Sequence, residues 1–273
     1  MNTLTNESIA INQWGENSSK LETLYSQLGN LYSERVQSGK SADRERELAL
    51  AEQYFNRAIV LQTQFQQQDA LANSLNNLAG LYRSQGRYND AEPLCLHSLE
   101  IWKRQLGDDH PDVASSLNDL ALLYGLQGRY NDAEPLFLQS LEIWKRQLGN
   151  DHPNVATSLN NLARLYKSQG KYLEAEDLAQ QALVIYQNRL GNEHFNTQNA
   201  AVTVKLLYVM ELLHCNEKTL IYILHTLAQQ ATLPELNNET ALTLLQRIES
   251  NPNLLLSIRE SLQQQTEASD GDT

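Results

Sequence analysis

The sequence repeats itself three times with a period of 42 residues. The copies begin at Leu71, Val113 and Val155, and the third copy ends at Asn196. A unit of this length holds one small supersecondary motif, which cannot bury its apolar face alone and must stack on copies of itself. The repeat therefore predicts one elongated array, although a chain of 273 residues would suffice for one or two ordinary domains.

Apolar residues in each copy follow two stripes that have the spacing of a helix face. In the first copy these stripes are Leu75, Leu78, Ala79 and Tyr82, and then Ala91, Leu94, Cys95, Ser98 and Leu99. Gly86 lies between the stripes, where a reversal of the chain needs a residue that accepts positive φ. Gly107 follows the second stripe as a helix stop, and Pro111 suits the first turn of the next helix. Each copy therefore predicts two antiparallel helices.

The segments on both sides of the three copies are less regular. Residues 1–18 are polar and are expected to be disordered or loosely docked. Residues 19–68 form a diverged first repeat with ten extra residues between its two stripes. Either the connection between its helices is longer, or its second helix begins earlier, at about Ser41.

The repeat array is predicted to span residues 69–215, with repeats at 69–112, 113–154 and 155–196 and a degenerate helix at 197–215. Residues 216–265 are expected to form a C-terminal helical cap, because the end of a repeat array must be covered. Asn216 and Asn238 are placed to begin two of its helices, and Ser250 or Asn251 to begin the last one. Residues 266–273 are expected to be a flexible tail.

The composition argues against several kinds of partner. The formal net charge of -12 repels phosphate backbones and anionic lipid head groups, so neither nucleic acid nor a membrane is predicted as a partner. Cys95 and Cys215 show no CxxC or Cys/His spacing, which disfavours a disulfide framework or a zinc site. The first residues lack the basic and apolar regions of a leader, and no run of 18 apolar residues follows. We expect a cytoplasmic protein.

The motifs of common enzymes are missing from the sequence. It has no Gly-rich phosphate loop, no GxSxG and no HExxH. His110, His152 and His194 recur once per copy, but each lies in a different connection and lacks a second ligand at i+3 or i+4. They do not predict a metal site. We therefore predict a protein with no catalytic residues, no metal and no cofactor.

The repeated motifs resemble the tetratricopeptide repeat. The 42-residue period and the strings SLNNLA, GRYNDAEPL, SLEIW and LGxDHP are similar, more narrowly, to the kinesin light chain type of that repeat. The resemblance covers residues 69–215 and, more weakly, residues 21–68. It implies an all-α fold, a right-handed α-solenoid of antiparallel helix hairpins, with a concave groove along the first helices that binds peptides or helices of partner proteins. The heptad region by which that family engages the motor chain has no counterpart in the first 68 residues, so motor association is not implied.

Asparagines recur at one position of the first helix, as Asn76, Asn118 and Asn160. The position points away from the seam between the paired helices, so it should line the groove wall. A carboxamide both donates and accepts hydrogen bonds, and such a ladder can pair with the backbone of an extended peptide whatever its side chains. The alternative is that these amides bond between neighbouring helices. Asparagines at this motif position also resemble peptide-contacting residues of kinesin light chain repeats.

The same wall is expected to carry Arg83, Arg164 and Lys167, together with the apolar Leu122. On an acidic protein, cations gathered on one concave wall would select an acidic peptide, because Arg can clamp carboxylates with two hydrogen bonds. A solvated face with scattered charges is the alternative. These three cations, Leu122 and the three asparagines form the predicted peptide-binding groove.

Two functions fit these features. The first is a non-catalytic protein–protein interaction scaffold, which binds a partner peptide or protein segment in the concave groove of the solenoid. The alternative is a ligand-responsive regulator or sensor, in which the C-terminal helices mediate output or dimerisation. Both leave the oligomeric state open.

Overall fold

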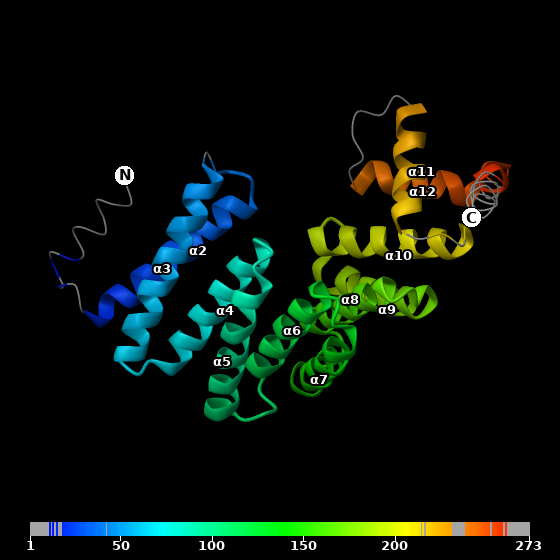
Figure 1. Cartoon of the computed structure of the whole chain (residues 1–273). Coiled ribbons are helices and arrows are strands. Elements are labelled where there is room, and N and C mark those ends of the chain that lie inside the picture. The colour runs from blue at the N-terminus through cyan, green and yellow to red at the C-terminus, as the bar shows by residue number, and fades with distance from the viewer. Residues whose placement is uncertain are drawn as a thin grey trace, which may run out of the picture. The chain divides into compact units, whose positions relative to one another are not determined.

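The computed structural model describes residues 18–41, 43–213, 217–230, 238–251 and 253–258, together with residues 11, 13, 15, 215 and 260. Every regular element within these residues is a helix, which confirms the all-α prediction (Figure 1). The chain divides into two compact units, residues 1–143 and 144–273, which are described separately. Most of the predicted loose segment 1–18 and all of the predicted tail 266–273 lie outside the described residues.

The first compact unit is built from helix hairpins. Its helices are α2 (Ser19–Gln37), α3 (Arg44–Gln64), α4 (Gln68–Ser84), α5 (Tyr88–Leu106), α6 (Pro111–Leu126) and the first part of α7 (Tyr130–Leu148). α2 packs along α3 and α4 packs along α5, while α3 contacts α4 and α5 contacts α6. The predicted antiparallel pairs therefore exist and stack in chain order.

The second compact unit begins within α7 and continues with five further helices. These are α8 (Pro153–Ser168), α9 (Tyr172–Leu190), α10 (Phe195–Leu213), α11 (Glu217–Gln230) and α12 (Asn238–Ser250). α8 and α9 form a hairpin, α10 packs against α9 and α12, and α11 packs against α12. Residues 253–258 form a further helical segment, in which Leu254 N–H donates to Asn251 Oδ1 at 3.1 Å. Asn216, the predicted start of α11, lies outside the described residues.

The repeated histidines begin the first helix of the hairpins. His110 Nδ1 accepts a hydrogen bond from the backbone N–H of Asp112 at 3.2 Å, and His152 Nδ1 accepts one from Asn154 N–H at 3.1 Å. A helix start leaves such N–H groups without backbone partners, and a proline at the first helical position removes one of them. The recurrence of histidine in each copy therefore has a structural explanation as a helix cap.

Glycines end the helices where the sequence predicts them. Gly86, in the connection from α4 to α5, has φ of 73°. Gly107, which follows α5, has φ of 82°. Both angles lie in the region that side-chain-bearing residues avoid, which confirms the predicted positive φ at Gly86 and the predicted helix stop at Gly107.

The ten extra residues of the first hairpin lengthen its helices as well as their connection. α3 has 21 residues and begins at Arg44, where the Asp43 side chain accepts from the backbone N–H of Arg46. The longer hairpin buries the Tyr54 ring between two tyrosines of α2. Its centroid lies 5.9 Å from that of Tyr25 and 5.9 Å from that of Tyr32.

A close contact between α2 and α3 forms at Gly29. A Cβ atom at this position would lie 2.7 Å from two ring carbons of Phe55, whose side chain is 1% exposed. We predict that Gly29→Ala lowers the free energy of unfolding by about 1–2 kcal/mol, because overpacking outweighs the gain in helix propensity. Urea denaturation monitored by circular dichroism measures the change.

Gly80 provides a matched control for this substitution. It is also a helix-interior glycine, in α4, but nothing lies within 4 Å of a Cβ built there. Gly80→Ala is expected to raise the free energy of unfolding by about 0.5–1 kcal/mol. Equal effects of the two substitutions would contradict the close approach of α2 and α3.

Candidate functional site

The first helix of each hairpin, the A helix, has one side that faces away from the second helix, the B helix. We call this side the A face. In α4 the buried side consists of Leu71, Ala72, Ser74, Leu75, Leu78, Ala79, Leu81 and Tyr82. The accessible side, at Asn73, Asn76, Gly80 and Arg83, repeats at intervals of three or four residues. In α6 the same positions are those of Ser115, Asn118, Leu122 and Gly125, and Asp119 and Leu126 are accessible beside them.

Asp119 joins the A faces of α4 and α6. Asn76 Nδ2 donates to Asp119 Oδ2 at 3.4 Å, and the Arg83 guanidinium lies 3.5 Å from Asp119 Oδ1. Burial raises the pKa of the Asp119 carboxyl above its usual value, while the charge of Arg83 opposes this shift. The structure therefore brings together two of the predicted groove residues, Asn76 and Arg83, through an acid that the sequence did not single out.

A small cavity of about 20 Å³ lies beside this pair. Asn76, Gly80, Arg83, Asp119 and Cys95 contribute to its lining. Its volume is close to that of a single water molecule, so a larger ligand would lie over Gly80 and would not enter the cavity. Burial raises the pKa of the Cys95 thiol to about 12, and the Asp119 charge adds to the shift. Cys95 is therefore a packed thiol that is protonated at neutral pH.

The predicted residues of α6 differ in accessibility. The Asn118 side chain is only 6% exposed, and Asp119 takes the accessible position beside it. Leu122 is half-buried on the A face, and Leu126, one turn later, is 50% exposed. The asparagine ladder therefore does not present three equivalent amides.

The remaining predicted residues lie on α8, in the second unit. Asn160 is half-buried, and its Oδ1 atom is buried with no hydrogen-bond partner among the described residues. Arg164 is exposed and Lys167 is half-buried. The A face of α8 is thus polar and cationic, as the sequence indicates.

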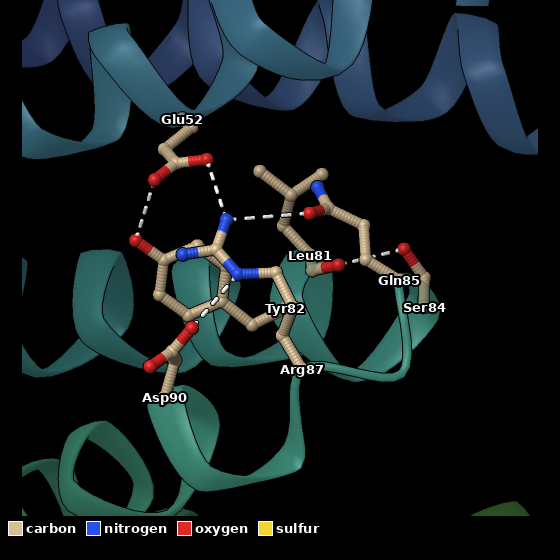
Figure 2. A network of polar contacts seen from close by, with 7 residues as sticks. All are labelled: Glu52, Leu81, Tyr82, Ser84, Gln85, Arg87 and Asp90. Carbon is tan, nitrogen blue, oxygen red and sulfur yellow. Dashed lines mark hydrogen bonds and ion pairs between the residues drawn. The ribbon is translucent and has the colours of Figure 1, made fainter. Parts of the chain in front are cut away.

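The structure also contains a polar network that the sequence analysis missed (Figure 2). Arg87, at the start of α5, stacks over the Tyr82 ring with its guanidinium carbon 3.9 Å from the ring centroid. Glu52 of α3 accepts from the Tyr82 hydroxyl at 2.8 Å and from Arg87 Nη1 at 2.9 Å. Asp90 accepts from Arg87 Nε at 2.8 Å. We call these four residues the first clamp, because they tie one hairpin to the next.

The same arrangement recurs one repeat later as the second clamp. Arg129 stacks over Tyr124 at 3.8 Å and donates to Glu92 at 3.0 and 3.1 Å and to Asp132 at 2.9 Å. Between the clamps lies an open depression of about 770 Å³, lined by residues 86–90, Glu92, Leu126, Gln127 and Arg129. Both arginines in its lining are already paired with carboxylates, so the clamps stabilise stacking and offer no free charge to a ligand.

The second clamp predicts a dependence of stability on pH. Burial would raise the pKa of the Glu92 carboxyl, but hydrogen bonds from Arg129 and Gln127 outweigh it and hold this pKa below its usual value of 4.5. A pKa that is lower in the folded than in the unfolded chain stabilises the fold above the unfolded pKa, and this contribution is lost as pH falls through the folded pKa.

We therefore expect Glu92→Gln to lower the melting temperature near neutral pH, and this difference should shrink as the pH falls below 4.5 and through the lowered pKa of Glu92. Thermal unfolding of both proteins across this range measures the difference. A difference that stays constant with pH would show that the ionised carboxylate does not stabilise the fold.

The comparisons with known proteins identify the repeats. The model of the tetratricopeptide repeat family matches residues 70–142 and 117–188. Residues 70–188 are tetratricopeptide repeats. Such repeats generally act as protein-interaction scaffolds, and the solenoid that they form is generally a non-catalytic fold. Among the residues that the structure describes, no helix is long and apolar enough to cross a membrane.

Solved structures with the same fold include kinesin light chain-like proteins. The structure of BtubC (BKLC) from P. vanneervenii has a TM-score of 0.59 and 23% identity, and covers 69% of this chain and 73% of that one. A putative kinesin light chain from Podosopora anserina with nearly identical TPR-like repeats has a TM-score of 0.57 and 20% identity, and covers 84% of this chain and 96% of that one. At these identities the similarity shows the fold, a tetratricopeptide α-solenoid.

A third structure places the fold in a larger protein. The signal transduction ATPase with numerous domains PH0952 from Pyrococcus horikoshii, described as having a tetratricopeptide repeat sensor, has a TM-score of 0.57 and 15% identity. The match covers 92% of this chain and 38% of that chain.

Proposed function

We propose that this protein is a non-catalytic scaffold that binds an extended segment of a partner protein along the A faces of its hairpins. The observation that carries the proposal is the open space above Gly80, in the middle of the A face of α4. A helix position without a side chain lets the main chain of a ligand come close. The partner's backbone would lie across this position.

Hydrogen-bonding groups on both sides of Gly80 support this placement. Asn76 lies one turn before Gly80 and Arg83 about one turn after it, both only partly buried. The Asn76 amide and the Arg83 guanidinium are donors for peptide carbonyl groups, and the Asp119 carboxylate is an acceptor for peptide N–H groups. An extended segment offers both kinds of group at every residue, whatever its sequence.

The predicted groove arginines of the two units differ in whether they are available to pair with a ligand. Arg83 is already paired with Asp119 in the first unit, whereas Arg164 in the second unit is exposed and forms no ion pair with the other described residues. We therefore place the preference for acidic side chains at Arg164 of α8. Arg164→Gln is expected to weaken binding of an acidic segment and to leave binding of a neutral one unchanged.

Binding with a matched pair of variants tests the proposal. The partner is captured from the source cell with the full chain, and its bound segment is mapped with overlapping peptides. Gly80→Leu, which fills the open position, is expected to weaken binding of that segment by roughly tenfold or more. His97→Leu adds the same side chain at an exposed position of α5 and should leave binding unchanged. Equal binding by both variants and the wild type would refute the A face as the site.

A ligand-responsive regulator is the second candidate. It is favoured by the C-terminal helices, which pack on α10 in place of a further repeat, and by the sensor role named for the larger archaeal protein. In this case the mapped segment should change the mass or shape of the protein measured by light scattering and small-angle X-ray scattering. Identical values with and without the segment would exclude it.

A further inference from the structure

The A face changes character in the last A helix. α10 begins at Phe195, 42 residues after the start of α8 at Pro153. The positions of Asn160, Arg164, Lys167 and Ser168 in α8 are therefore taken in α10 by Val202, Leu206, Val209 and Met210. A face that is polar and accessible in α8 has become an apolar stripe in α10.

The chain covers this stripe with its own C-terminal helices. Val209 and Met210 are 0% exposed and Leu213 is 4% exposed. They share one apolar cluster with residues of α11 and α12, and Leu206 packs against it. The cluster members from these two helices are Leu220, Leu224, Leu227, Leu244, Leu245 and Ile248. α11 and α12 (orange in Figure 1) thus occupy the side of α10 that corresponds to the candidate binding face.

α12 has the chemistry of an amphipathic helical ligand. Leu244, Leu245 and Ile248 are buried on one side, whereas Gln246 and Arg247 are exposed on the other. At the edge of the contact Glu249 accepts from Lys205 Nζ of α10. Leucine and isoleucine at helical spacing, with one acid beside a lysine, form the pattern by which a helix binds an apolar groove.

We propose that α12 is a built-in ligand of the A face of α10. While it is docked, the surface available to partners ends at α8. When it leaves, an apolar site opens on α10 for a partner helix with the same pattern, namely two or three aliphatic residues on one side and an acid that meets Lys205. The inference takes from the proposed function only that the A face is the face that recognises partners.

A simpler interpretation is that α12 replaces the missing B helix of a fourth repeat. The positions of α10 that lie 42 residues after those of α8 exclude it. In the regular copies the B helix packs on the stripe that contains Leu159, Leu162, Ala163 and Tyr166. The equivalent positions in α10 include that of Tyr208, which remains 38% exposed, while Lys205 lies at the edge between the two sides. The residues that α11 and α12 bury lie on the other side of α10, so these helices occupy the place of a ligand.

Binding of the chain's own segment in trans tests this proposal. The receptor is the full chain with Leu245→Asp and Ile248→Asp, which places charges in the apolar contact and undocks α12. The probe is a fluorescent synthetic peptide of residues 238–258, and binding is measured by anisotropy. We expect the variant to bind the peptide at least roughly tenfold more tightly than the wild type, whose site is filled.

Two controls locate the binding. A peptide that carries the same two aspartates should not bind, and Val209→Asp added to the receptor should abolish binding of the normal peptide. If the double aspartate variant loses its helical circular dichroism, Glu249→Lys provides a milder receptor. That receptor should also bind the peptide better than the wild type does.

The proposal is overturned if a folded receptor variant binds the peptide no better than the wild type. It is also overturned if Val209→Asp has no effect, because the peptide would then bind elsewhere. These results for peptide binding to α10 do not depend on the result of the Gly80→Leu experiment on α4. Failure of that substitution to affect partner binding would refute the proposed site on α4 and leave the α10 result standing.

Discussion

Replacing Tyr54 by alanine is expected to lower the free energy of unfolding by about 3–5 kcal/mol, the range for removal of a buried aromatic ring. Tyr54 is 1% exposed, and its ring stacks against both Tyr25 and Tyr32. Removing it would leave a cavity between α2 and α3 that two large rings cannot fill without moving. Urea denaturation and amide hydrogen exchange of α2 and α3 measure the loss.

Tyr54→Phe is the matched control for this prediction. It keeps the ring and both stacking contacts and removes only the hydroxyl, so we expect a loss of at most about 1.5 kcal/mol. If the alanine variant costs no more than the phenylalanine variant, the stacked tyrosines do not hold the first hairpin together.

Leu207→Ala is expected to lower the free energy of unfolding by about 2–5 kcal/mol. The Leu207 side chain of α10 is 0% exposed and packs in a cluster with Ala163, Ala175 and Ala179 of α8 and α9. Leu207 is the largest of the buried side chains in this cluster, and the partly buried Tyr166, Tyr172, Leu178 and Val204 pack around it. A further alanine at this position would leave an unfilled space between α10 and the preceding hairpin.

Phe195→Ala provides the comparison for Leu207. Phe195 lies in the same helix but is 69% exposed, so its removal should change the free energy of unfolding by less than about 0.5 kcal/mol. Similar losses for the two variants, measured by urea denaturation, would contradict the packing of α10 on α8 and α9.

The repeated features of the fold could be predicted because they depend on local pattern. The stripe that contains Leu75 and Leu78 gives the buried side of α4, and Gly86 and Gly107 mark turns that require positive φ. These signals recur three times in register, so each copy supports the interpretation of the others. The start of α3 at Arg44 is harder to predict, because the first hairpin has no second copy to compare.

The polar contacts could not be predicted in the same way. Glu52 lies in α3, about one repeat before Arg87, and the sequence gives no reason to pair it with that arginine rather than with another. One sequence signal for these contacts was available: a cation follows the glycine in each copy, in the strings GRY, GRY and GKY. In the third copy this cation is Lys171, which also lies over a tyrosine, 4.8 Å from the ring centroid of Tyr166. The sequence pattern also does not indicate that Asn118 is buried while its neighbour Asp119 is accessible.

The covered apolar stripe on α10 could not be recognised from the sequence for a different reason. Val209 and Met210 continue the 42-residue register, but their apolar character resembles that of any buried helix. Only the packing of Leu245 and Ile248 against this side reveals that it corresponds to the A face. Non-local contacts of this kind depend on how the C-terminal helices fold back, which no periodicity encodes.

Hydrogen exchange of the full chain, with and without the mapped partner segment, tests the central claim most directly. If a partner binds along the A faces of the first unit, exchange should slow in α4 and α6, with the largest change around Gly80, while the exposed side of α5 stays unchanged. Protection confined to α5, with α4 and α6 unaffected, would show that the partner binds the opposite side and would contradict the account.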